Sequence, residues 1–182
     1  MTTAQAPEQN STPKTYSQKL AFYHPNSPGN GSALQLEPRL NRHEGDRYNC
    51  FFFEMATQKT AATRNDDKRA PATFDWEHKL TVKLDFTDIC ELLTVLEGHA
   101  DKVGDQRNGL YHENGKSNTL ITFQKGEKGG YLVGLSRKDK QGGQISRTHI
   151  ILTDAEAIGL RCILQTSLFV LTFHNCMRPE AA

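Results

Sequence analysis

Alternating apolar and polar residues predict a series of β-strands in the first half of the chain. Between residues 32 and 37, Leu34 and Leu36 alternate with Gln35 and Glu37, which is the period-two pattern of a strand with one solvated face. The aromatic run at residues 50–55 has high strand propensity. Two further strands are predicted at residues 20–23 and 80–84, and a polar loop is predicted at residues 58–71.

The apolar spacing changes to that of a helix after residue 85. Apolar residues spaced i, i+3, i+4 and i+7 form one stripe of a predicted helix over residues 86–96. Asp85 and Asp88 have the spacing of a capping box in which the second acid is shortened. Gly98 stands where a glycine commonly ends a helix.

The second half of the chain repeats this order of elements. Its helix is predicted over residues 155–171, behind a capping box formed by Thr153 and Glu156. The helix is apolar on most sides, so it is expected to be buried in a core or at a subunit contact. The strands before it are predicted at residues 109–112, 119–124, 131–136 and 146–152.

The layout is therefore two ββββα halves, an α+β fold in which two antiparallel sheets pack with two helices. Residues 19–174 are expected to form one domain, since a chain of 182 residues can bury a sizeable core. Residues 1–18 are mostly small and polar and cannot offset their ordering entropy, so a disordered tail is predicted there. Residues 175–182 are expected to form a short C-terminal tail.

Composition and motifs argue against several classes of protein. The formal net charge is +1, from 22 basic and 21 acidic residues, so no broad positive field draws the molecule to a polyanion. The four cysteines lack metal-ligand spacing and are expected to be reduced thiols. No zinc-protease, deaminase, Walker or dinucleotide motif occurs, so we expect no enzyme activity, no cofactor and no metal site.

The ends of the chain and its longest apolar region bear on location. No targeting signal is visible at the N-terminus. The longest apolar region, residues 158–173, is interrupted by Arg161 and Gln165 and is expected to be too short and too polar to span a bilayer. The sequence predicts a soluble intracellular protein, in the cytoplasm or nucleoid, without membrane contact.

Four stretches in order resemble the Whirly family, single-stranded DNA-binding proteins known mainly from plants. Residues 29–39 (GNGSALQLEPR) are similar to the family's signature strand, and residues 74–79 (FDWEHK) to its Tyr-Asp-Trp turn. Residues 129–136 (GGYLVGLS) are similar to a Gly-Gly-Tyr strand, and residues 153–156 (TDAE) to the start of its last helix. The order and spacing of these stretches, together with the doubled ββββα plan, carry the resemblance.

The resemblance implies sequence-tolerant binding of single-stranded DNA between the protomers of a homotetramer, with the last helices at its centre. Guide-RNA-binding proteins of trypanosome mitochondria and PUR repeats share the plan, so an RNA-binding protein of the same fold is an alternative. A protein-interaction oligomer that binds no nucleic acid is another. Gly29 and Gly31 replace both lysines of the family's signature strand, so phosphate contacts must come from elsewhere.

Sequence-independent binding of an unpaired strand requires aromatic faces for stacking and cations for phosphates. Trp76 is flanked by polar residues in the sequence and is the strongest stacking candidate. Other aromatic candidates on or beside strands are Tyr23, Phe51, Phe53 and Tyr131. Basic candidates are Arg137, Lys138 and Lys140, which cluster with Arg147 at a Gly-Gly hairpin, and Lys79 and Lys83 on the outward face of the fourth strand. Ser32, Gln35 and Arg39 lie on the strand that resembles the signature strand and complete the predicted interface.

Overall fold

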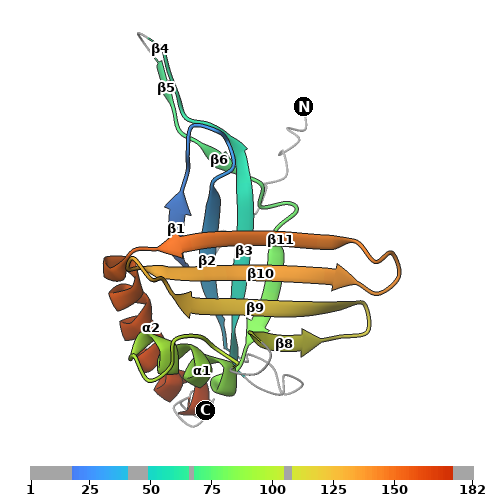
Figure 1. Cartoon of the computed structure of the whole chain (residues 1–182), viewed down its shortest axis with the longest axis vertical. Coiled ribbons are helices and arrows are strands. Elements are labelled where there is room, and N and C mark those ends of the chain that lie inside the picture. The colour runs from blue at the N-terminus through green and yellow to red at the C-terminus, as the bar shows by residue number, and fades with distance from the viewer. Residues whose placement is uncertain (1–17, 41–48, 66–67, 105–107, 174–182) are drawn as a thin grey trace, which may run out of the picture.

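The computed structural model describes residues 18–40, 49–65, 68–104 and 108–173. Both predicted tails lie outside this part, apart from residue 18. The described residues form an α+β fold of two main antiparallel sheets and two helices (Figure 1). Nearly every predicted strand and helix is found within one to three residues of its expected ends. The exceptions are the third strand, which is five residues longer, and the predicted loop at residues 58–71, which is largely extended chain.

The first sheet has the strand order β1-β2-β3-β7, all antiparallel. These strands are β1 (Leu20–His24), β2 (Ser32–Arg39), β3 (Cys50–Thr60) and β7 (Leu80–Leu84), and the short β6 (Thr73–Phe74) pairs with the far end of β3. Beyond β3, β4 (Thr63–Asn65) and β5 (Lys68–Ala70) form a two-stranded hairpin that projects from the body of the molecule (Figure 1). The prediction of a loop at residues 58–71 is therefore wrong.

The second sheet has the order β11-β10-β9-β8 and is a simple antiparallel meander. Its strands are β8 (Leu110–Glu113), β9 (Ser117–Lys125), β10 (Tyr131–Asp139) and β11 (Ile145–Leu152). They run across the strands of the first sheet, with β11 over β2 and β3 (Figure 1). The Ser32 hydroxyl on β2 donates a hydrogen bond to the His149 carbonyl on β11 and joins the two sheets.

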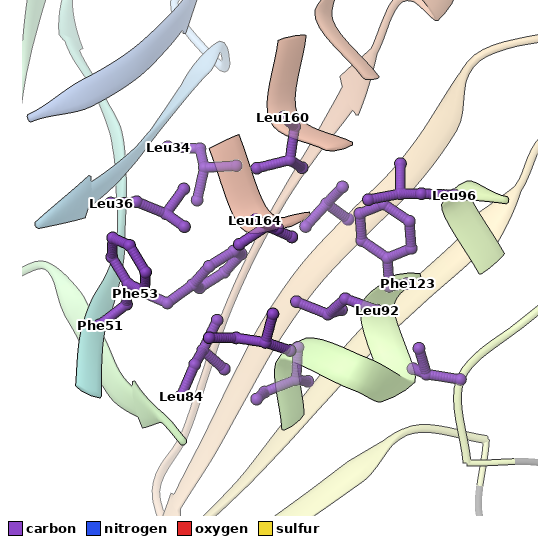
Figure 2. Close-up of a cluster of buried hydrophobic side chains, with 14 of the residues drawn as sticks. Leu34, Leu36, Phe51, Phe53, Leu84, Leu92, Leu96, Phe123, Leu160 and Leu164 are labelled. Carbon is purple, nitrogen blue, oxygen red and sulfur yellow. The ribbon is translucent and has the colours of Figure 1, made fainter. Parts of the chain in front are cut away.

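The hydrophobic core lies between the sheets and is closed by both helices (Figure 2). Because side chains alternate along a strand, every second residue of β2 and β3 points into it. Leu34, Leu36 and Phe53 do so, and each is at most 1% exposed. On the opposite side, Phe123 of β9 lies near Leu92 and Leu96 of the first helix (Figure 2).

Both helices begin at the predicted capping boxes. In α1 (Phe86–Leu96), the Asp85 carboxylate accepts hydrogen bonds from the Thr87 and Asp88 amides, and the Asp88 carboxylate accepts one from the Asp85 amide. Gly98 follows the helix with φ of +79°, a conformation that glycine adopts without strain. At α2 (Asp154–Phe173), Thr153 and Glu156 form the equivalent reciprocal pair.

Candidate nucleic-acid interface

The face of the first sheet that points away from the core carries most of the exposed aromatic and basic chemistry of that sheet. We call it the outer face. It consists of the residues of β1, β2, β3 and β7 that alternate with the core residues. From one end to the other, their register gives the rows Tyr23–Ala33–Ala56, then Ala21–Gln35–Glu54–Thr81, then Glu37–Phe52–Lys83.

One end of the outer face forms an open aromatic pocket. The Tyr23 ring lies 5.5 Å from the Phe74 ring and 6.4 Å from the Trp76 ring, centroid to centroid. Ala33 and Ala56, which follow Tyr23 in the register, are fully buried, whereas Tyr23 itself is 52% exposed. The aromatic pocket has a volume of about 500 Å³ and is lined by Tyr23, Pro25, Pro71, Ala72, Thr73, Phe74 and Trp76.

A tight turn holds Trp76 at this pocket. The Asp75 amide donates to the Thr57 carbonyl of β3 at 2.9 Å, which ties the turn to the sheet. The Asp75 carboxylate lies 2.9 Å from Nδ1 of His78 and accepts from the His78 amide at 3.3 Å. The hydrogen bond between the side chains of Asp75 and His78 lowers the pKa of Asp75 below its ordinary value. The predicted polar surroundings of Trp76 thus serve to position its ring.

At the other end of the outer face, Phe52 lies beneath two cations. The Arg39 guanidinium carbon is 5.0 Å from the centroid of the Phe52 ring, and the Lys83 ammonium is 5.8 Å from it. Both distances are within the range of a cation–π contact. Because these cations lie over the ring, a base would stack on Phe52 by displacing them, and the displaced cations could then contact the phosphates beside it.

Between the two aromatic ends, a buried carboxylate network occupies the outer face. Glu54 is only 3% exposed and is held by Lys79 at 2.7 Å, by Lys19 at 3.7 Å and by the Gln35 amide. Burial raises the pKa of Glu54, but the hydrogen bonds from Lys79 and Gln35 outweigh it, and the pKa lies below its ordinary value. Glu37 pairs with Lys19 at 2.7 Å and with Arg39 at 3.0 Å. The middle of the face is therefore largely neutralised.

Several predicted contact residues are placed elsewhere. Phe51 and Phe53 are 5% and 1% exposed and belong to the core, so neither is accessible to a base. Tyr131 packs against the core, with its ring 5.7 Å from that of Phe123. The Ser32 hydroxyl is committed to the bond between the sheets and the Gln35 amide to Glu54. Burial removes Phe51 and Phe53 from the predicted interface, and the other three residues have partners within the protein.

The predicted basic cluster at residues 137–140 is not a continuous positive patch. Arg137 and Lys138 are consecutive on β10 and point to opposite faces of the second sheet. Arg137 lies 3.5 Å from the Asp139 carboxylate, and the Lys140 ammonium bonds to Glu113. Among the described residues, Lys138 and Arg147 remain exposed without an ion-pair partner, on the outward side of the second sheet.

Gly31 stands where the resembled Whirly strand has a lysine, and the structure leaves no room for a side chain at this position. A Cβ at this position would fall on the His24 carbonyl oxygen and within 2.9 Å of the Pro25 Cα. Gln58 closes the site from β3, because its side-chain oxygen accepts from the Asn26 and Gly31 amides and its NH2 donates to the Asn26 and Thr60 carbonyls. No lysine fits there without movement of the backbone.

Phe52 is the residue that sequence reasoning missed. It stands between two core aromatics, and nothing in the run at residues 51–53 distinguishes the outward ring from the inward ones. The polar residues at the same register, Glu37 and Lys83, are the signal that could have identified it. In the described part of the chain, no three His, Cys, Asp or Glu side chains gather in a way that could hold a metal ion.

The last helix leaves a broad apolar surface uncovered. Ala157, Leu160, Leu164 and Leu171 face the core, whereas other large apolar side chains point outward. Ile158 and Phe169 are 57% and 60% exposed, and Ile163 and Phe173 are also exposed. The helix has 20 residues, and an 18-residue window of it has a mean hydropathy of 1.3, which is enough to cross a membrane by length and composition alone; 22% of that window is buried. The expectation that this region is too short and too polar to span a bilayer is therefore wrong.

Several solved structures have the same fold. WHY1 from Arabidopsis thaliana superposes with a TM-score of 0.66 at 17% identity, covering 94% of this chain and 99% of that one. The structure of the plant transcriptional regulator PBF-2 superposes with a TM-score of 0.65 at 19% identity, covering 94% of this chain and 92% of that one. A chain of a guide-RNA-binding protein complex bound to a guide RNA superposes with a TM-score of 0.55 at 17% identity, covering 87% of this chain and 94% of that one. No protein-family model and no curated protein matches the chain. The likeness confirms the fold implied by the resemblance.

Proposed function

We propose that this protein binds single-stranded nucleic acid across the outer face of its first sheet, without reading sequence. The observation that carries the proposal is the pairing of an open aromatic pocket with a second, half-buried ring, Phe52, on the same face. Stacking on such rings contributes about 1–3 kcal/mol per base and accepts every base, because each has a π-face. Arg39 and Lys83 supply phosphate contacts beside Phe52.

The geometry suits an extended strand better than a duplex. Ala56, in the same register row as Tyr23, and Phe52 are four residues apart on β3, about 13 Å at ~3.3 Å per residue. A strand lying along β3 would place one base in the pocket and another on Phe52, and its middle would pass over the neutralised carboxylate network. Paired bases cannot offer their faces in this way, since they are stacked inside the helix.

Single-stranded DNA is the favoured partner, and RNA is the alternative. The resemblance to the Whirly family favours DNA. The shared fold of a guide-RNA-binding complex is the observation that favours RNA. The described rings and cations are suited to base faces and phosphates, which both polymers present.

We further propose a closed homo-oligomer, a tetramer by resemblance, joined through the exposed apolar surface of α2. Ile158 and Phe169 are more than half exposed, and an apolar surface of this size on a folded domain usually marks a partner. The competing assignments for the same helix are an interaction module without nucleic acid and a membrane contact. Asp154, Glu156 and Arg161 on α2, together with its core-facing leucines, favour the oligomer of a soluble, intracellular protein.

The deciding experiment is fluorescence anisotropy with a labelled oligothymidine, its RNA equivalent and a DNA duplex of equal length, at several salt concentrations. Tight binding of the single strands and weak binding of the duplex are expected. Trp76→Ala should weaken single-strand binding by about 1–3 kcal/mol at an unchanged salt dependence, because stacking releases no counterions. Equal affinity for duplex and single strand, or no binding at all, would contradict the proposal.

A further inference from the structure

The β4–β5 hairpin is a second concentration of positive charge, distinct from the outer face. Residues 59–70 contain four basic and two acidic residues, a net of +2 against +1 for the whole chain. The hairpin stands out from the body at the end of β3 (Figure 1). Isolated two-stranded hairpins of this length are marginally stable, so a projecting one gains from a partner that orders it.

Two arginines face each other on this hairpin. Arg64 and Arg69 are directly opposite in the β4–β5 register, so their side chains lie on the same face. Both are exposed, and neither forms an ion pair with any described residue. Like charges placed directly opposite destabilise a strand pair unless a counter-charge lies between them. The pair is arranged to receive an anion.

The hairpin leads directly into the aromatic pocket. Ala70 is followed by Pro71, and the chain from Pro71 to Phe74 forms one wall of that pocket. Arg69 precedes Pro71 by two residues, which places it within about 7 Å of the pocket rim along the chain. A strand with a base in the pocket would therefore continue within reach of both arginines.

We propose that the β4–β5 hairpin is a basic arm that binds the phosphate backbone of the single strand where it leaves the aromatic pocket. The inference rests on the proposed function and deepens it, because it extends the binding path beyond the outer face. A phosphodiester backbone would supply the counter-charge that no described residue provides to the Arg64–Arg69 pair. A second copy of the arm would bring arginine against arginine, which is why nucleic acid is the preferred occupant.

The test compares Arg64→Gln/Arg69→Gln with wild type, by anisotropy on oligothymidines of about 4 and about 16 nucleotides. On the longer strand, the double neutralisation should weaken binding and reduce the log–log salt slope by roughly 1.4, at ~0.7 for each of two phosphate contacts. The shorter strand is long enough to reach from the pocket to Phe52 but not to extend along the arm as well, and should be less sensitive. Arg64→Lys/Arg69→Lys keeps both charges and should keep the slope.

The charge-matched control is Lys125→Gln/Lys128→Gln, which removes two exposed cations beside the start of α2 and should leave the slope unchanged. If wild type binds both strands and the arm variant binds them with wild-type slopes, the arm inference is wrong and the proposed function stands. If wild type binds neither, the proposed function fails. A change of oligomeric mass in the arm variant, with an unchanged slope, would assign the arm to a second copy and overturn the inference.

Discussion

Nε2 of His112 on β8 lies 3.0 Å from Oδ1 of Asp88, the third residue of α1. The first half of the chain contributes the helix of this pair and the second half contributes the strand. The reciprocal pair also exists, because His24 on β1 lies 2.8 Å from Glu156, the third residue of α2. In each case an edge strand of one half is tied to the capping box of the other half, so the two ββββα units interlock.

The His112–Asp88 pair makes stability depend on pH. The hydrogen bond to Asp88 raises the pKa of His112 above 6.5, against the lowering effect of burial. A histidine with a raised pKa in the folded state contributes its full stabilisation below its unfolded pKa and loses it as pH rises through the folded value. We expect His112→Asn to lower the free energy of unfolding by about 1 kcal/mol near pH 5.5, and by progressively less towards pH 9.

Urea unfolding of wild type and variant across this pH range measures the difference. Asp88→Asn is the control, since it removes the carboxylate but keeps an oxygen that can accept from the Asp85 amide. In that background, replacement of His112 should have an effect that varies much less with pH, because Asp85 is then the remaining carboxylate that raises the pKa of His112. If His112→Asn in the otherwise wild-type protein lowers the free energy of unfolding by the same amount from pH 5.5 to 9, the His112–Asp88 pair is not the source of the pH dependence.

Substitutions of the adjacent residues Phe52 and Phe53 should affect nucleic-acid binding and folding stability separately. Phe52→Ala is expected to reduce single-strand affinity by about 1–3 kcal/mol, because it removes a stacking face, with little change in stability. Phe53→Ala removes a ring that is 1% exposed, and should reduce the free energy of unfolding by about 3–5 kcal/mol. Anisotropy and urea unfolding on both variants test the pair. A Phe52 variant with wild-type affinity would remove that ring from the interface.

Gly31→Ala should destabilise the protein, because the new methyl group would meet the His24 carbonyl and the Pro25 Cα. Overpacking of this kind costs about 1–3 kcal/mol. Gly115→Ala is the matched control, since no atom lies within 4 Å of the place that its new methyl group would take, and it should change stability by less than about 0.5 kcal/mol. Equal unfolding midpoints for the two variants would show that the β1–β2 turn adapts.

Exposed and buried positions of α2 should respond differently to a charge. Phe169→Asp is expected to break the oligomer and leave the protomer folded, so light scattering should approach the protomer mass of 20.4 kDa. Leu164→Asp introduces a charge at a position that is fully buried, and should prevent folding instead. If light scattering shows that the wild-type protein is already a monomer, the proposed assembly is wrong.

The sequence by itself determined the order and type of most elements. Period-two alternation in β2, the apolar stripe of α1 and the capping boxes at Asp85 and Thr153 depend on residues close together in the chain. The doubled ββββα plan follows from these local patterns. The fold could be predicted this far because each element carries its own periodicity and its own end signals.

Only the tertiary structure decided which side chains are available to a partner. The run at residues 51–53 is aromatic throughout, and a shift of one residue in strand register would exchange its inward and outward rings. Pairing of Phe52 with Glu37 and Lys83 fixes that register. The same holds for the cations, because Lys79 and Lys140 are neutralised by carboxylates distant in the sequence. The β4–β5 hairpin escaped prediction because Thr63, Arg64, Arg69 and Ala70, whose burial is described, are all exposed, so no alternation marks its strands.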